Sequence, residues 1–167
     1  MRNRIWNEIT QSKHNIEFTS LYCERQRFIL RLFNIGILSF SSAGIMGWGF
    51  WDKLPLVSCI TIALISLLRL LQPHLIMSDE QLKKLDDIHN FYTEYFNKIE
   101  KLWYDFESDR ITEGQAAKLF FKIKKTETNI NPIIIIIIIE TIKSKPKKIV
   151  KKSKEHSDNY FKQIFNI

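Results

Sequence analysis

The sequence predicts an all-α membrane protein, in which a two-helix transmembrane hairpin carries a cytosolic helical bundle. Residues 32–51 are 20 residues without a charge, and residues 54–77 add 24 residues in which Arg69 is the only Lys, Arg, Asp or Glu. A helix rises about 1.5 Å per residue, so each stretch is long enough to cross a hydrocarbon core of roughly 30 Å. A periodic apolar series then follows, and this pattern predicts packed amphipathic helices.

The same pattern divides the 167 residues into four segments. We expect a cytosolic N-terminal amphipathic helix over residues 1–31, continuing into the first span, and a hairpin over residues 32–77. A cytosolic helical region over residues 78–141 and a basic C-terminal tail over residues 142–167 complete the chain. Many Lys and Arg residues flank the hairpin, whereas Lys53 alone lies between the spans. The positive-inside rule therefore predicts a two-pass protein with both termini in the cytoplasm.

The first helix is expected to run from about residue 4 to about residue 51, because no Pro or Gly separates its cytosolic part from the first span. Spacings of four and three residues place one partly polar stripe on a single face of this helix. The stripe consists of Ile5, Ile9, Ser12, Ile16, Thr19, Cys23, Gln26 and Leu30.

The clearest periodicity lies after the second apolar stretch. Ser78 is a favourable N-cap, and Asp79 and Glu80 follow it in the first turn, where acids are stabilising. Spacings of three and four then continue for almost four heptads, and we call this series the seam. The seam consists of Leu82, Leu85, His89, Tyr92, Phe96, Ile99, Trp103 and Phe106. It is typical either of a helix within a cytosolic bundle or of a coiled coil between subunits.

A further helix is predicted to begin at Thr112, which forms a capping-box pattern with Gln115. It should end near Lys125 and bury Ala116, Leu119, Phe120 and Ile123. Residues 133–139 are seven isoleucines, about 10 Å long as a helix and too short for a third span. β-Branching permits a strand here, but the absence of a strand partner favours a short buried helix.

The predicted spans carry small and polar residues on separate faces. Ser39, Ala43 and Gly47 are four residues apart, a pattern that lets another helix approach closely. Polar residues within a span face protein or water rather than lipid. Those that we expect to line a pore are Asn34, Ser41, Ser58, Thr61, Arg69 and Gln72. Two simpler interpretations stay open, because small residues also pack a hairpin and the Arg69 side chain can reach the headgroups as an anchor.

The C-terminal tail is rich in lysine, and its last residues, 156–167, are expected to form one or two amphipathic turns. Attraction to anionic lipid headgroups and simple solubility are the ordinary explanations of such a tail. Phosphate binding is the alternative, although the tail lacks the interleaved aromatic residues of a surface that contacts nucleic-acid bases. The candidate phosphate ligands are Lys143, Lys145, Lys147, Lys148, Lys151 and Lys152.

No catalytic motif is present in the chain, so we expect no enzyme activity. There is no GxSxG, P-loop or HExxH sequence. The two cysteines and four histidines are scattered, without the spacing of a metal site. We therefore expect no metal and no cofactor.

The layout resembles the SLATT family of two-span effector proteins from bacterial conflict systems. A basic helix enters a first span that ends in GIMGWGFW, a tight hairpin leads to the second span, LVSCITIALISLL, and a long helix with an aromatic series follows. The resemblance covers roughly residues 4–125. It implies a pore-forming effector at the bacterial cytoplasmic (inner) membrane, controlled by a nucleotide or oligonucleotide that a partner nucleotidyltransferase makes. The chain has no appended sensor domain of the kind found beside this family.

We therefore expect an ion-channel-forming effector of anti-phage defence, whose activity depolarises the membrane and stops growth or kills the cell. Two spans bury too little surface to enclose a conduit, so a homo-oligomer, most simply a tetramer, is required. The alternatives are a membrane-anchored adaptor and a nucleic-acid-responsive regulatory protein.

Overall fold

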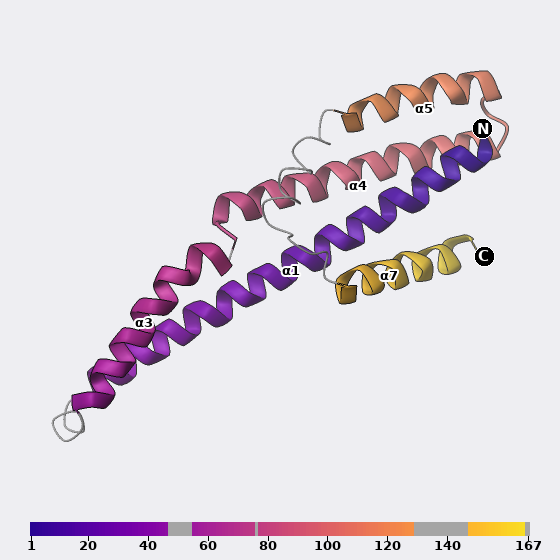
Figure 1. The fold of residues 1–167 in the computed structure, drawn as a ribbon. Helices are drawn as coiled ribbons and strands as arrows, with labels where there is room; N and C mark the ends of the chain where they lie inside the picture. Colours follow the sequence, from indigo (N-terminus) through magenta and orange to yellow (C-terminus); the bar gives the residue numbers. More distant parts are fainter. Residues whose placement is uncertain (47–54, 76, 129–146, 166–167) are drawn as a thin grey trace. The chain divides into compact units, whose positions relative to one another are not determined.

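The computed structural model describes residues 1–46, 55–75, 77–128 and 147–165. In these ranges all regular structure is α-helical, in α1 (Arg2–Met46), α3 (Pro55–Leu75), α4 (Asp79–Glu107), α5 (Glu113–Thr128) and α7 (Lys147–Phe165) (Figure 1). The chain divides into two compact units. Unit 1 comprises Met1–Cys23 and Lys83–Ile167, and unit 2 comprises Glu24–Leu82.

The structure contradicts the predicted transmembrane hairpin. Within the residues that the structure describes, none of the helices combines the length and the apolar character that crossing a membrane requires. In α3 the apolar run is interrupted by Arg69 and then by Gln72 and His74.

Side-chain caps start the two helices that the sequence predicted after the apolar stretches. The Ser78 backbone N–H donates to Gln81 Oε1 at 3.0 Å and the Gln81 N–H donates to Ser78 Oγ at 3.2 Å, so α4 begins with a reciprocal capping box. Thr112 and Gln115 form the same arrangement before α5, at 2.9 and 3.4 Å. Both predicted helix starts are confirmed.

A Schellman motif ends α4. The Arg110 N–H donates to the Asp105 carbonyl at 3.0 Å, and the Asp109 N–H donates to the Phe106 carbonyl at 3.2 Å. Asp109 has a φ of 53°, in the left-handed region that glycine usually occupies at this position. This turn reverses the chain, so that α5 runs back along α4 (Figure 1).

Five members of the predicted stripe of the first helix are buried in unit 1, whereas Ile16, Gln26 and Leu30 are half-buried. Ile5 and Ile9 are completely buried, and Ser12, Thr19 and Cys23 are less than 8% exposed. The helix is continuous through Met46, as predicted, and its expected extension to residue 51 lies outside the described residues. Polar members of the stripe contact α4: Thr19 Oγ1 lies 3.3 Å from His89 Nδ1, and Cys23 Sγ donates to Asp86 Oδ1 at 3.1 Å.

Most of the seam is buried, and from Leu85 onwards it belongs to unit 1, which favours the interpretation as a helix of a bundle. Its most deeply buried member is Ile99, which is completely buried, and the Trp103 ring lies 5.1 Å from that of Trp6 on α1. A second buried stripe on α4, which was not predicted from the sequence, consists of Ile88, Tyr95 and Leu102. Their seven-residue spacing is a signal in the sequence, and they are buried because α1 and α5 together cover more than one face of α4.

Helix α5 is held to α1 by charged and aromatic contacts. Lys124 Nζ lies 2.7 Å from Glu8 Oε1, and the Arg4 guanidinium lies over the Phe121 ring. Ala116 and Phe120 are buried as predicted. The predicted burial of Leu119 is wrong, because this residue is 43% exposed.

Helix α7 is longer than the one or two turns expected from the sequence. It covers 19 residues and begins at Lys147, inside the lysine-rich segment. Four residues at four-residue spacing form its buried face, namely Ile149, Ser153, Ser157 and Phe161. The two serines have little side chain, so α7 approaches α1 closely. The predicted helix over the isoleucine run 133–139 lies outside the described residues.

Candidate functional site

Unit 2 exposes a large set of apolar side chains on α1 and α3. Phe28 and Leu70, for example, are 60% and 70% exposed. We call the whole set the apolar surface, and its members are Phe28, Leu32, Ile35, Leu38, Ile60, Ile62, Leu64, Leu67 and Leu70. Monomeric proteins rarely leave contiguous apolar patches of more than a few hundred Å² in water, so a surface of this kind marks contact with a partner or a membrane.

Helical spacing gathers most of the apolar surface onto one face of each helix. Phe28, Leu32 and Ile35 follow one another at intervals of four and three, and so do Ile60, Leu64 and Leu67. Residues at these intervals lie one above the other along a helix. Each helix therefore presents a continuous apolar stripe.

Basic residues precede the apolar surface along α1. Arg25, Arg27 and Arg31 have exposed side chains and are spaced by one helical turn or less. Arg25 and Arg27 precede the first residue of the apolar surface, and Arg31 lies among its first residues. Between residues 25 and 78 the sequence contains one acidic residue, Asp52. The surroundings of the apolar surface are therefore positively charged.

Three of the predicted pore-lining residues line one cleft in unit 2. Asn34 from α1 and Arg69 and Gln72 from α3 border a cleft of about 420 Å³, together with Ile37 and Leu38. The guanidinium and two amides supply several hydrogen-bond donors beside aliphatic walls. The structure thus brings together polar residues that are 35 or more positions apart in the sequence.

The structure describes only some of the other residues that were predicted to function in the hairpin. Ser39 is exposed, and a Cβ added at the neighbouring Gly36 would meet nothing within 4 Å, so no described helix approaches closely there. Gly47 lies outside the described residues. Four other predicted residues belong to α1 or α3, but the structure does not describe their side chains. These residues are Ser41, Ala43, Ser58 and Thr61.

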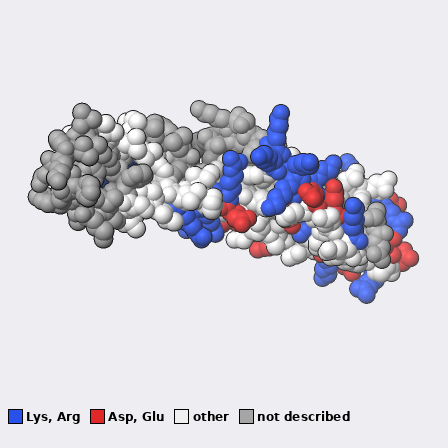
Figure 2. All heavy atoms as spheres, turned by 90° about the horizontal axis from the view of Figure 1, so that it is seen from below, with Lys and Arg blue, Asp and Glu red and all other residues white. Residues whose placement is uncertain are grey.

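The candidate phosphate-binding lysines fall into two groups. Lys147, Lys148, Lys151 and Lys152 are exposed on α7, whereas Lys143 and Lys145 lie outside the described residues. Figure 2 shows Lys and Arg side chains, with some Asp and Glu among them, on the face of the molecule seen from below. The sequence did not predict a helix before residue 156. Because α7 begins earlier than that, four of these lysines are arranged along one helix.

A part-buried polar network connects three helices of unit 1. The Tyr95 hydroxyl donates to Glu8 Oε1 at 2.8 Å, and Lys124 contacts both Glu8 and Glu127. Burial, and then the hydrogen bond to Glu8, raises the pKa of Tyr95 well above its usual range. Burial also raises the pKa of Tyr92 to about 12. For Lys124, burial would lower the pKa, but the hydrogen bonds to Glu127 and Glu8 outweigh it and raise the pKa.

Metal-binding chemistry finds no support in the described part of the chain, where no three His, Cys, Asp or Glu side chains are close enough together to hold an ion. Comparison with family models, with curated proteins and with solved structures finds no match to this chain. The features of the chain that bear on its function are therefore the apolar surface, the cleft of unit 2 and the contacts of unit 1.

Proposed function

We propose that the chain is a homo-oligomeric effector that acts on a lipid bilayer through unit 2 and makes the bilayer permeable to ions. The apolar surface carries this proposal, because its members are between 47% and 70% exposed. Removing apolar area from water is worth about 25 cal/mol per Å², so a lipid environment would stabilise these side chains substantially.

The charge around the apolar surface supports lipid as its partner. Arg25, Arg27 and Arg31 lie beside it, and acids are almost absent from the surrounding sequence. Bacterial membranes present anionic headgroups, and each Lys or Arg near such a surface contributes about 1 kcal/mol of attraction. A protein partner of matching chemistry would need acidic residues around its own apolar patch.

The cleft of unit 2 supports a conduit rather than passive attachment. Asn34, Arg69 and Gln72 offer polar groups next to the apolar surface, so an assembly of several copies can present polar groups to water and apolar groups to lipid. One copy has too few helices to enclose water, and we expect a closed ring, most simply a tetramer. Arg69 would attract anions and repel cations in such an opening.

Bacterial defence is the setting that the sequence pattern favours, through its resemblance to SLATT effectors. In this setting the protein acts at the cytoplasmic membrane, and a change in a nucleotide or oligonucleotide signal, made by a partner nucleotidyltransferase, opens the assembly. The outcome is depolarisation followed by growth arrest or death.

The decisive test is ion current through planar bilayers of phosphatidylethanolamine and phosphatidylglycerol at unequal salt. We expect discrete currents with wild-type protein, and a shift of reversal potential towards cation preference for Arg69→Glu. Lys101→Glu, an exposed charge reversal on α4, is the matched control and should leave selectivity unchanged. Stable binding to liposomes with no current under any condition would reject the pore and favour a membrane-bound adaptor.

A further inference from the structure

The polar side chains of the cleft in unit 2 have no partners among the described residues. Asn34, Arg69 and Gln72 line this cleft, and none of the three forms a side-chain hydrogen bond or an ion pair within the described part of the chain. Asn34 and Arg69 are exposed and Gln72 is half-buried, so a molecule in the cleft can reach all three. A guanidinium and two amides present mainly N–H donors and one positive charge, which favours an anion with several oxygen atoms.

The sequence around the cleft supplies no nearby carboxylate for Arg69. Asp52 is the only Asp or Glu between residues 25 and 78, and it is far along the chain from both walls of the cleft. Copies of unit 2 packed side by side in a ring would bring more arginines, rather than acids, to the level of the cleft. The anion is therefore expected from another molecule.

Arg31 extends the positive charge beyond the cleft. Arg31, Asn34 and Leu38 follow one another at intervals of three and four on α1, so they share one side of the helix. Arg31 is exposed, and its position is about 4.5 Å along the helix axis from that of Asn34. An anion bound at Asn34 and Arg69 is thus attracted by a second guanidinium.

The cleft adjoins the apolar surface, and this neighbourhood decides the kind of anion. Leu38 lines the cleft and also belongs to the apolar surface, with 68% of its area exposed. Leu70, which follows Arg69 in the sequence, is another exposed member of that surface. A free phosphate would leave these side chains in water, whereas an anion with a hydrocarbon part would cover them. The two sets of side chains together favour an amphiphilic anion.

We propose that the cleft binds the headgroup phosphate of an anionic phospholipid such as phosphatidylglycerol. The planar guanidinium of Arg69 donates two parallel hydrogen bonds to phosphate oxygens. The amides of Asn34 and Gln72 donate to the phosphate and accept from the headgroup hydroxyls. The headgroup of phosphatidylcholine carries its own ammonium, which Arg69 and Arg31 repel, so the cleft prefers the anionic lipid. The acyl chains then lie against the apolar surface.

This inference rests on the proposed function for the contact between unit 2 and a bilayer, and its test needs no ion current. Binding of the full chain is measured by flotation with vesicles of phosphatidylcholine alone and of phosphatidylcholine mixed with phosphatidylglycerol, at constant salt. Arg69→Gln should weaken binding to the mixed vesicles at least about thirtyfold, because it removes both general attraction and hydrogen bonds to a charged group. Its binding to pure phosphatidylcholine should change little.

The charge-matched control is Arg25→Gln. Arg25 is exposed on α1, nine residues before Asn34 and therefore on the opposite side of the helix. This variant loses only general attraction and should weaken binding to the mixed vesicles about fivefold. Gln72→Leu keeps the charge and removes hydrogen-bonding groups, so it should lower the preference for the mixed vesicles about tenfold. Equal losses in Arg69→Gln and Arg25→Gln, or an unchanged preference in Gln72→Leu, would overturn the site, since basic residues anywhere in unit 2 would then explain the preference.

A second measurement uses the unaltered chain. Phosphatidylglycerol vesicles should protect Arg69 from phenylglyoxal, a reagent that modifies accessible guanidinium groups, more than phosphatidylcholine vesicles do, and inorganic phosphate should not protect it. Equal protection by the two lipids would remove the headgroup contact, and protection by inorganic phosphate at the same concentration would assign the cleft to free phosphate instead. Preference for phosphatidylglycerol without any current would leave the site standing and reject the pore, whereas current without this preference would reject the site and leave the proposed function.

Discussion

At the scale of single residues, the polar network around Glu8 is the feature most sensitive to substitution. Tyr95 is 1% exposed and donates to Glu8, and Lys124 neutralises the same carboxylate. A carboxylate in a part-buried site is stabilised only while its partners remain. The network therefore fixes α1, α4 and α5 against one another.

Tyr95→Phe should lower the free energy of unfolding by about 1 kcal/mol, because Glu8 loses a buried hydrogen bond while the ring is kept. Urea unfolding of the full chain, followed by helical circular dichroism, measures the change. Tyr104→Phe is the matched control, since the Tyr104 side chain is 49% exposed, and it should change stability much less. Equal effects of the two substitutions would mean that the Tyr95–Glu8 contact does not stabilise the fold.

The raised tyrosine pKa values predict a loss of stability in alkali. Tyr92 has a pKa of about 12 in the folded chain against 10 when unfolded, so the folded state holds its proton more tightly. The associated stability is complete below pH 10 and is lost as the pH rises from 10 to 12. Unfolding free energies measured over this range should fall less steeply in Tyr92→Phe than in wild type. Parallel pH curves would contradict the burial of this hydroxyl.

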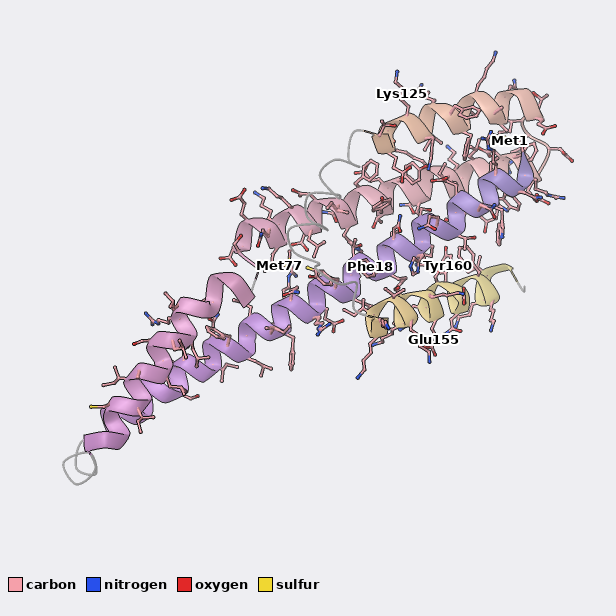
Figure 3. The ribbon with its side chains drawn as sticks, in the orientation of Figure 1. Met1, Phe18, Met77, Lys125, Glu155 and Tyr160 are labelled. Atoms are coloured by element: carbon pink, nitrogen blue, oxygen red, sulfur yellow. The ribbon has the colours of Figure 1, made fainter. Side chains whose placement is uncertain are left out.

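At the scale of elements, α7 is the helix whose attachment depends on small side chains. Ser153 is completely buried, and Lys13 of α1 lies 4.1 Å from the centre of the Tyr160 ring. Tyr160 also donates to Glu100 of α4 at 2.8 Å and is labelled beside α1 in Figure 3. α7 thus contacts two helices along a serine-lined face.

Ser153→Leu should destabilise unit 1 by about 1–3 kcal/mol, because the larger side chain overfills the contact between α7 and α1. Limited proteolysis of the full chain should then cut within α7 sooner than in wild type. The control is Lys152→Leu, which adds the same side chain at an exposed neighbouring position. Similar proteolysis of both variants would show that the serine face does not set the approach of α7.

At the scale of the whole molecule, the two units have different surfaces. The described part of unit 1 buries an aliphatic and aromatic core and exposes many charges, whereas unit 2 exposes the apolar surface. Within unit 1 the exposed large apolar side chains are few and are distributed over three helices, with Tyr104 on α4, Leu119 and Phe121 on α5, and Ile164 on α7. Isolated side chains of this kind are normal, and the concentration in unit 2 is not.

Ile35→Asp combined with Leu67→Asp should greatly reduce flotation of the protein with liposomes, because two charges then sit within the apolar surface. Ile164→Asp is the control, since Ile164 is 48% exposed in unit 1, and it should leave flotation unchanged. Unchanged flotation of the double variant would show that the apolar surface does not contact lipid and would remove the main support for the proposed function.

The sequence alone determined α4, α5 and the course of α1 through unit 1, together with much of their buried faces. Caps at Ser78 and Thr112, the stripe of the first helix and the seam were all predictable, because they depend on residues three or four positions apart. Tertiary structure decided which helix covers which face: Tyr95 meets Glu8 across 87 positions, and no local pattern encodes that pairing. It also revealed the serine face of α7, whose residues resemble those of a solvated helix, and the cleft that joins Asn34 to Arg69. The predicted membrane-spanning hairpin is wrong, because none of the described helices combines the length and the apolar character that crossing a membrane requires, and in α3 the apolar run contains Arg69.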